Sequence, residues 1–143
     1  MTVGNLTDFA ALDPFFAVIQ EGLKGHAEGE HFFDLLAEDV VTEFVVTVPG
    51  FPRRVEGRAA LAELYRPYGE GIVLESADDL AVYHDQEKSV VVLEYTVHGR
   101  LVATGGPYQN RFVSIVTITD GKVTHWRDYL DSHAAVEALG GAS

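Results

Sequence analysis

The sequence predicts an α+β fold in which a strongly curved, mostly antiparallel sheet carries helices on its concave face. Apolar residues recur at helical spacing in the N-terminal half, whereas from Ile72 onward the chain reads as long β segments. Asp120-Gly121, a strong two-residue hairpin signal, joins the last two segments. Helices first and antiparallel strands afterwards are typical of this class. We expect one domain (1–143) shaped as a cone-like α+β barrel, with three N-terminal-half helices and a short C-terminal helix.

The N-terminal half alternates helical and extended patterns. Leu12, Phe15 and Ile19 recur at helical spacing, and Pro14 suits a first helical turn. A second helical pattern would place Phe32 on the same face as two leucines. The expected elements in chain order are helices at 13–24 and 27–37, a strand at 40–48 stopped by Pro49, a short strand at 53–56, and a helix at 60–68 that ends at Gly69 to Gly71.

The C-terminal half predicts four long strands and one short helix. Gly105-Gly106-Pro107 indicates a bulge or bend within the third of these strands. Asp131 or Ser132 can cap the final helix. The expected elements are strands at 72–84, 88–99, 101–118 and 122–130, with turns at 85–87 and around Gly99-Arg100, and a helix at 133–139 ended by Gly140-Gly141.

The composition and net charge of the chain limit the kinds of molecule that it is expected to bind. The formal net charge of −12 disfavours nucleic acid and anionic membrane surfaces, which attract basic faces. There are no cysteines, so thiolate nucleophiles and cysteine-based metal sites are excluded, and the scattered histidines support no metal site. The sequence contains no signal-peptide pattern or membrane-length apolar run. We therefore expect a cytoplasmic protein without a cofactor, whose partner is a small, weakly charged molecule or another protein chain.

The last strand carries the residue that most needs a functional explanation. Its alternation places Trp126, Asp128 and Leu130 on one face and His125, Arg127 and Tyr129 on the other. Trp126 and Leu130 favour burial, so Asp128 lies between them in an apolar environment. A buried carboxylate must be paired, hydrogen-bonded or protonated. The first interpretation is a general acid/base with a raised pKa; the alternative is a structural ion pair with Arg111 or Arg127.

Two neighbouring strands supply further candidates. Tyr108, Asn110 and Phe112 share one face, and the first two can donate hydrogen bonds to a substrate oxygen; alternatively, Asn110 serves the Gly106-Pro107 bend. Trp126 can form a pocket wall or simply fill the core.

Tyr95 is a second hydroxyl candidate if its face of the strand is internal. In that register Glu94 and His98 lie on the outer face. The reverse register would place Glu94 and His98 inside as an acid/base pair. Tyr65 and Tyr68 are interpreted as packing residues.

The order of elements resembles the SnoaL-like, or nuclear-transport-factor-two-like, superfamily. The stretches that carry the resemblance are Leu36 to Val41, Val55 to Leu61, Tyr108 to Val113 and Asp120 to Asp131. The superfamily includes polyketide cyclases, ketosteroid isomerase, limonene epoxide hydrolase, dehydratases and members that only bind. The resemblance implies a small-molecule cavity within the cone and a homodimer formed through the outer face of the sheet.

Individual positions separate these activities. Asp128 after Trp126 is similar to the final-strand Asp of the epoxide hydrolase, but the hydrolase's Arg and second Asp fall at Tyr95 and Val97. Its water-holding Tyr and Asn fall at Thr42 and Phe44, and the catalytic Asp of the isomerase also falls at about Phe44. The acid/base Asp of the cyclases is matched by Asp128 or Asp131. The cyclase resemblance therefore fits the sequence best, although it depends on one residue.

The sequence thus predicts a homodimeric pocket protein that acts on a small, apolar, cyclic molecule. Asp128 would serve as general acid/base in an isomerase, cyclase or lyase step. The alternative is a ligand-binding or scaffold protein without turnover, and epoxide hydrolysis ranks third. The residues expected to contact substrate are Trp126, Tyr108, Asn110, Phe112, Tyr95, Thr42, Phe44 and Leu130.

Overall fold

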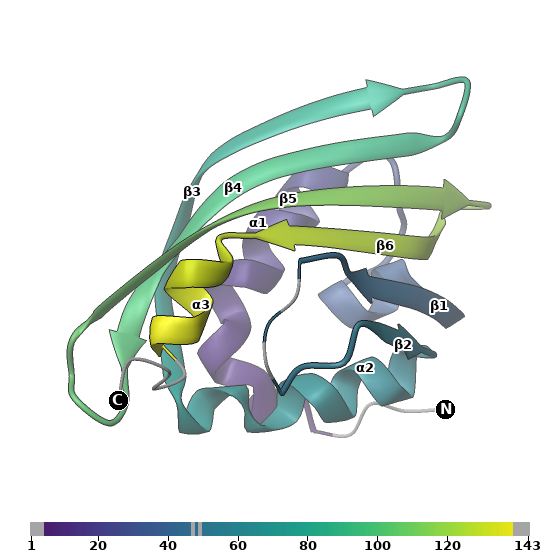
Figure 1. Cartoon of the computed structure of the whole chain (residues 1–143). Helices are drawn as coiled ribbons and strands as arrows, with labels where there is room; N and C mark the ends of the chain where they lie inside the picture. The colour runs from purple at the N-terminus through teal and green to yellow at the C-terminus, as the bar shows by residue number, and fades with distance from the viewer. Residues whose placement is uncertain (1–4, 47, 49, 139–143) are drawn as a thin grey trace.

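A computed structural model describes residues 5–46, 48 and 50–138 and confirms the predicted α+β class (Figure 1). A curved six-stranded sheet wraps around helices on its concave side without closing into a complete barrel. None of the helices formed by the described residues is long and apolar enough to span a membrane.

The helices are α1 (Asp13–Leu23), α2 (Arg58–Tyr65) and α3 (Ser132–Ala138), with 3₁₀ turns η1 (Leu6–Leu12), η2 (Phe32–Leu35) and η3 (Arg66–Glu70). The strands are β1 (Leu36–Phe44), β2 (Arg54–Glu56), β3 (Ile72–Asp85), β4 (Val90–Leu101), β5 (Pro107–Thr119) and β6 (Lys122–Leu130).

The sheet has the strand order β2-β1-β6-β5-β4-β3. All neighbouring strands are antiparallel except β1 and β6, which run parallel. The predicted Asp120-Gly121 hairpin is confirmed, because φ is +52° at Asp120 and +78° at Gly121, as a type I′ turn requires. This turn sets the register between β5 and β6 and so decides which residues of the two strands face one another.

Helix α1 fills the concave side of the sheet with its predicted apolar face. Phe16, Ile19 and Leu23 are fully buried, and Pro14 occupies the first turn of the helix. The ring of Phe16 stacks on Phe32 with centroids 4.8 Å apart. Together with Phe9 and Phe33 these rings form an aromatic core between the helices and the sheet.

The second predicted helix, over 27–37, is wrong. Only the short turn η2 forms there, and β1 already begins at Leu36. Part of the backbone of this segment bonds to the β5–β6 hairpin: Glu28 N–H donates to the Gly121 carbonyl at 2.8 Å, and Lys122 Nζ donates to the carbonyls of Glu28 and Asp34. The predicted apolar residues are nevertheless buried, because a 3₁₀ turn followed by a strand can also direct them inward.

The turn between the second and third long strands lies further along the chain than predicted. Strand β4 continues through Gly99 and Arg100 to Leu101, and the chain reverses over 102–106, so Gly105 and Gly106 form the turn instead of a bulge within a strand. The predicted strand over 40–48 ends at Phe44. Thr47, Pro49 and the predicted helix end at Leu139, Gly140 and Gly141 lie outside the described residues.

Candidate functional site

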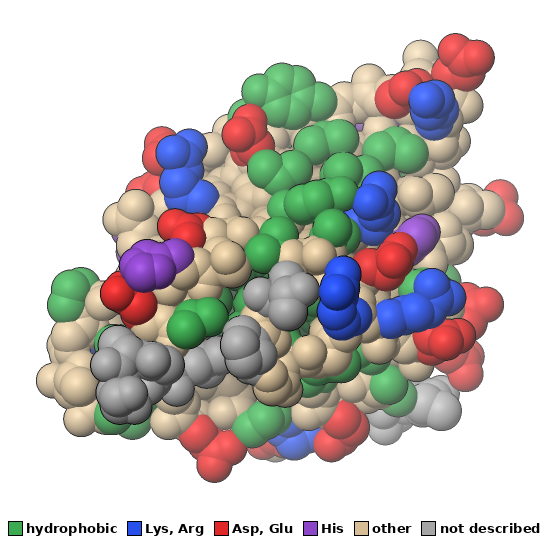
Figure 2. Space-filling view, viewed as in Figure 1, with side chains coloured by type: hydrophobic (Ala, Val, Ile, Leu, Met, Phe, Trp, Pro, Cys, Tyr) green, Lys and Arg blue, Asp and Glu red, His purple; other side chains and the backbone are tan. Residues whose placement is uncertain are grey.

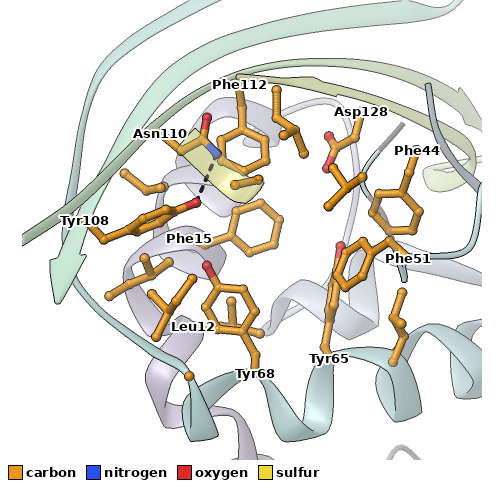
Figure 3. A pocket seen from close by; sticks show the side chains of 18 of the residues that line it. Leu12, Phe15, Phe44, Phe51, Tyr65, Tyr68, Tyr108, Asn110, Phe112 and Asp128 are labelled. Atoms are coloured by element: carbon orange, nitrogen blue, oxygen red, sulfur yellow. Dashed lines mark hydrogen bonds between the residues drawn. The ribbon is translucent and has the colours of Figure 1, made fainter. Parts of the chain in front are cut away.

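A cavity of about 260 Å³ lies between the concave face of the sheet and the helices (Figure 3). Strands β5 and β6 form one wall, and α1, α2 and η3 form the opposite side. Most of the lining is apolar, with aromatic rings on several sides. The main apolar lining residues are Leu12, Phe15, Phe44, Phe51, Ile72, Leu74, Phe112 and Leu130. The polar groups among the described lining residues are Tyr65, Tyr68, Tyr108, Asn110 and Asp128.

Asp128 is the charged group of this lining and lies in the wall formed by β6. Its side chain is only 3% exposed, as its position between Trp126 and Leu130 predicts. Two donors meet at one carboxylate oxygen: Ser114 Oγ donates at 2.6 Å and Trp126 Nε1 donates at 2.6 Å. The register explains both contacts, because Ser114 is paired with Asp128 across β5 and β6, while Trp126 lies two residues earlier on the same face. The second carboxylate oxygen accepts no hydrogen bond from the described residues.

Burial raises the pKa of Asp128 to about 6, and the hydrogen bonds from Ser114 and Trp126 oppose this rise. The alternative of an ion pair is not what the structure shows. Arg127 lies on the other face of β6 and donates to the Tyr129 hydroxyl at 2.8 Å, and Arg111 is an exposed residue beside the outer face of the sheet. Asp128 therefore has hydrogen-bond donors but no cation partner among the described residues, which is the arrangement in which a carboxyl group can exchange a proton near neutral pH.

The structure divides the other predicted site residues into two groups. Phe44, Tyr108, Asn110, Phe112 and Leu130 line the cavity. Trp126, Tyr95 and Thr42 are buried but are not among the described lining residues.

These three buried residues have separate environments. Trp126 packs against Phe32 and donates to Asp128. Tyr95 stacks on Phe112 with centroids 5.4 Å apart and shares a hydrogen bond of 2.9 Å with Ser114 Oγ. The Thr42 hydroxyl is buried without a hydrogen-bond partner among the described residues. Trp126 and Tyr95 thus act on Asp128, directly or through Ser114, from behind the cavity wall.

Asn110 holds the junction between β6 and α3. Its Oδ1 accepts from the Asp131 N–H at 3.0 Å, and its Nδ2 donates to the Asp131 carbonyl at 3.3 Å and to the Tyr108 hydroxyl at 3.0 Å. The predicted alternative, in which Asn110 serves the Gly106-Pro107 bend, is wrong because the bonds go to Asp131. The Asp131 carboxylate accepts from the backbone N–H groups of His133 and Ala134, as expected of a helix N-cap.

Tyr65 and Tyr68 are the polar residues that the sequence analysis assigned to packing. Both rings do lie on the inner side of the α2–η3 segment, but here that side borders the cavity. In Figure 3 the Tyr65 hydroxyl points toward the Asp128 side and the Tyr68 hydroxyl toward Tyr108. Burial, followed by the charge of Asp128, raises the pKa of Tyr65 well above its usual value. Helical spacing located this face correctly but could not distinguish a cavity wall from solid core.

The register of β4 settles the positions of Glu94 and His98. Leu93, Tyr95 and Val97 are buried on the concave side, as predicted for the first of the two registers. Glu94 contacts the exposed Tyr83 hydroxyl, and His98 Nε2 is hydrogen-bonded to Asp78 at 3.1 Å on the outer face. The two residues therefore do not form an acid/base pair inside the cavity.

Replacing Ser114 with alanine is expected to raise the pKa of Asp128 further, above about 6. The Ser114 hydroxyl donates to the charged carboxylate, so its loss removes an interaction that lowers this pKa. The sole tryptophan, Trp126, bonds to the same oxygen, and its fluorescence can follow the titration. Thr117→Ala, on the same strand but paired with His125, is the control and should leave the midpoint unchanged. An unchanged midpoint in Ser114→Ala would contradict this account of the site.

Comparison with known proteins agrees with this architecture. The sequence matches the family model of the SnoaL-like domain over residues 9–126. Uncharacterized protein YesE of Bacillus subtilis (strain 168) is 32% identical over 109 residues, which cover 76% of this chain and 74% of that protein. The crystal structure of a candidate isomerase from Bacillus subtilis is 30% identical, with a TM-score of 0.74 and 96% of both chains covered.

A second solved structure supports the fold alone. It is a candidate polyketide cyclase from Pseudomonas putida KT2440, 22% identical with a TM-score of 0.64, and the match covers 92% of this chain and 96% of that one. The family match spans most of the chain, from η1 into β6, where it ends at Trp126. The resemblance predicted from the sequence is confirmed, and the chain belongs to the SnoaL-like domain family.

Proposed function

We propose that this protein is a cofactor-independent isomerase, cyclase or lyase that uses Asp128 as general acid/base on a small, apolar, cyclic substrate. The observation that carries the proposal is a buried carboxyl group with a pKa of about 6, beside an apolar cavity and without a cation partner among the described residues. An acid/base group is most effective when its pKa lies near the working pH. Asp128 meets this condition.

The proposed step begins with a substrate ring held between Phe44, Phe112 and Leu130. The Asp128 carboxylate removes a proton from a carbon next to a carbonyl group, the electron pair of the broken C–H bond forms a C=C bond, and the π pair of the carbonyl group moves to its oxygen to give an enolate. The protonated Asp128 then returns the proton to the same or a conjugated carbon. Ser114 and Trp126 hold the carboxyl group in position throughout, so the free oxygen can face the substrate.

Deuterium exchange tests this step without knowledge of the natural substrate. A bicyclic ketone such as 1-tetralone, incubated with the protein in D₂O, should acquire deuterium next to its carbonyl group, as followed by proton NMR. We expect Asp128→Asn to lower the protein-dependent rate by about 100-fold, within the range for general acid–base catalysis. The rate should also rise with pH to a plateau above about 6, because the base must be deprotonated.

Asp131→Asn is the matched control for this experiment. Asp131 lies three residues later, its side chain is exposed and caps α3, and asparagine is also a good N-cap. The sequence left Asp128 and Asp131 as alternatives for the catalytic carboxylate, so the pair of variants separates them. Equal exchange rates in Asp128→Asn and the natural chain would contradict the proposal.

The alternative of a ligand-binding protein without turnover depended on an arginine that neutralises Asp128. No described residue supplies one, so the acid/base proposal is preferred. The arginine and second aspartate of an epoxide hydrolase have no counterpart at Tyr95 and Val97, and a failure to form diol from simple cyclic epoxides would exclude that activity.

We also propose a homodimer formed through the outer face of the sheet. Figure 2 shows hydrophobic side chains gathered over β3, β4 and β5. The register places Tyr83, Val92 and Ile115 in one row across these strands, and the Tyr83 side chain is 56% exposed. A row of this kind is a typical contact surface. Light scattering that gives only the monomer mass would exclude the dimer.

A further inference from the structure

We propose that the cavity selects neutral ligands with an acceptor oxygen, which the Tyr68–Tyr108 pair binds at the end away from Asp128. Figure 3 shows the Tyr108 and Asp128 side chains on opposite sides of the cavity, with Phe15 and Phe112 between them. The inference deepens the proposed function, since it names the chemistry of the ligand that would present a carbon to Asp128. It depends on three observations: the fixed orientation of Asn110, the donors of the two phenols, and the charge of the lining.

Asn110 determines how the Tyr108 oxygen is used. The Asp131 N–H is a donor, so the Asn110 atom that contacts it at 3.0 Å must be the amide oxygen. The amide nitrogen therefore faces the Tyr108 hydroxyl and donates to it at 3.0 Å. Because both ends of the Asn110 amide are engaged by β6–α3 and Tyr108, its direct role is to orient Tyr108.

The two phenols contain at least one more donor than the described residues can accept. The Tyr68 hydroxyl lies on the same side of the cavity as the Tyr108 hydroxyl, which accepts from Asn110 (Figure 3). Each phenol has one O–H group, so at most one of the two protons can be used between them, whichever ring donates. At least one O–H therefore has no acceptor among the described residues and borders the cavity. A carbonyl, ether or hydroxyl oxygen of a ligand would satisfy it.

The charge of the lining excludes anionic ligands. The described lining residues include no lysine, arginine or histidine, and the one charged group is the Asp128 carboxylate. An anionic ligand would be desolvated beside a like charge without a compensating cation, which is strongly unfavourable. A neutral molecule with an acceptor oxygen satisfies both the phenol pair and the apolar walls.

Three ligands of one shape test the inference: 1-tetralone, tetralin without the oxygen, and 1,2,3,4-tetrahydro-1-naphthoate with a carboxylate. Equilibrium dialysis at pH 8 measures their dissociation constants. We expect 1-tetralone to bind about 10-fold more tightly than tetralin, as one net hydrogen bond provides, and the carboxylate to bind more weakly than both. In the double variant Tyr68→Phe/Tyr108→Phe, the ratio of the tetralin and 1-tetralone dissociation constants should fall below about twofold, and the affinity for tetralin should be unchanged. Tyr83→Phe, which removes an exposed hydroxyl from the outer face, is the control.

The ligand series in the natural chain is decisive even if the double variant fails to fold. Equal affinities for 1-tetralone and tetralin, absence of 1-tetralone binding up to its solubility limit, or tight binding of the carboxylate would each overturn the inference. Persistence of the preference in a folded double variant would do so as well. The same series in Asp128→Asn separates this inference from the proposed function: the preference for the ketone should persist there, although deuterium exchange should be lost.

Discussion

At pH 8, Asp128→Asn is expected to be more stable toward unfolding than the natural chain by about 3 kcal/mol. The folded state raises the pKa of Asp128 from 3.8 to about 6. Each unit of difference between folded and unfolded states corresponds to roughly 1.4 kcal/mol, and the shift is about two units. Asparagine keeps an oxygen that can accept from Ser114 and Trp126 but carries no charge. The variant therefore avoids the desolvation of the carboxylate.

The sign of the pH dependence follows from the same shift. Between pH 3.8 and about 6 the folded chain binds more protons at Asp128 than the unfolded chain does, so this group's contribution to stability falls as pH rises through that window. The advantage of Asp128→Asn should thus be small at pH 4, grow through pH 6 and remain constant above it. Burial lowers the pKa of His31, but His31 is common to both proteins, so its contribution cancels in the difference.

Urea unfolding of both proteins at several pH values between 4 and 8 measures this difference. Asp131→Asn is again the control: it removes an exposed carboxylate, so the burial argument predicts no stabilisation at pH 8. The difference in the free energy of unfolding between Asp128→Asn and the natural chain should change with pH. A difference that stays constant would show that Asp128 does not titrate as the structure indicates. A stabilised variant that has lost proton exchange would fit a site maintained for function at the expense of stability.

The C-terminal half was predictable because local chemistry determines it. The Asp120-Gly121 turn favours positive φ at both central positions, and the alternation around Trp126 and Asp128 identifies the buried face of β6 without knowledge of the fold. The burial of Asp128 could therefore be inferred from its neighbours. Its hydrogen-bond partner Ser114 could not, because that contact depends on the register between β5 and β6, which is a property of the sheet.

The errors occur where tertiary contacts override local pattern. The segment around Glu28 has helix-compatible spacing, yet its backbone is satisfied by Gly121 and Lys122, which lie far away in sequence. Tyr65 and Tyr68 were assigned to the core because an inward-facing side chain looks the same in sequence whether it meets another side chain or a cavity. The excess donor of the tyrosine pair became apparent only from the hydrogen bonds of Asn110.

Gly99 caused a further error, and its replacement by alanine is expected to reduce the free energy of unfolding by about 3 kcal/mol. A glycine in this position suggested a turn, but Gly99 lies within β4, paired with Leu74 on β3 and Tyr108 on β5. A Cβ at this position would clash with the backbone of Val73 and Leu74. Glycine is needed here because the β3 backbone approaches closely, which is a recognised reason for glycine inside a strand. Backbone atoms cannot move aside as a side chain can, so the penalty lies at the upper end of the range for overpacking.

Urea unfolding of Gly99→Ala, with Gly71→Ala as the matched control, tests this account. A Cβ at Gly71 would meet no atom within 4 Å, and the φ of Gly71 is −114°, so the control should change stability only slightly. Gly99 lies opposite Tyr108, so separation of β3 from β4 should also disturb the end of the cavity formed by Tyr68 and Tyr108. We therefore expect weaker 1-tetralone binding in any folded fraction. A Gly99→Ala protein as stable as Gly71→Ala would mean that the two strands are not in the register described here.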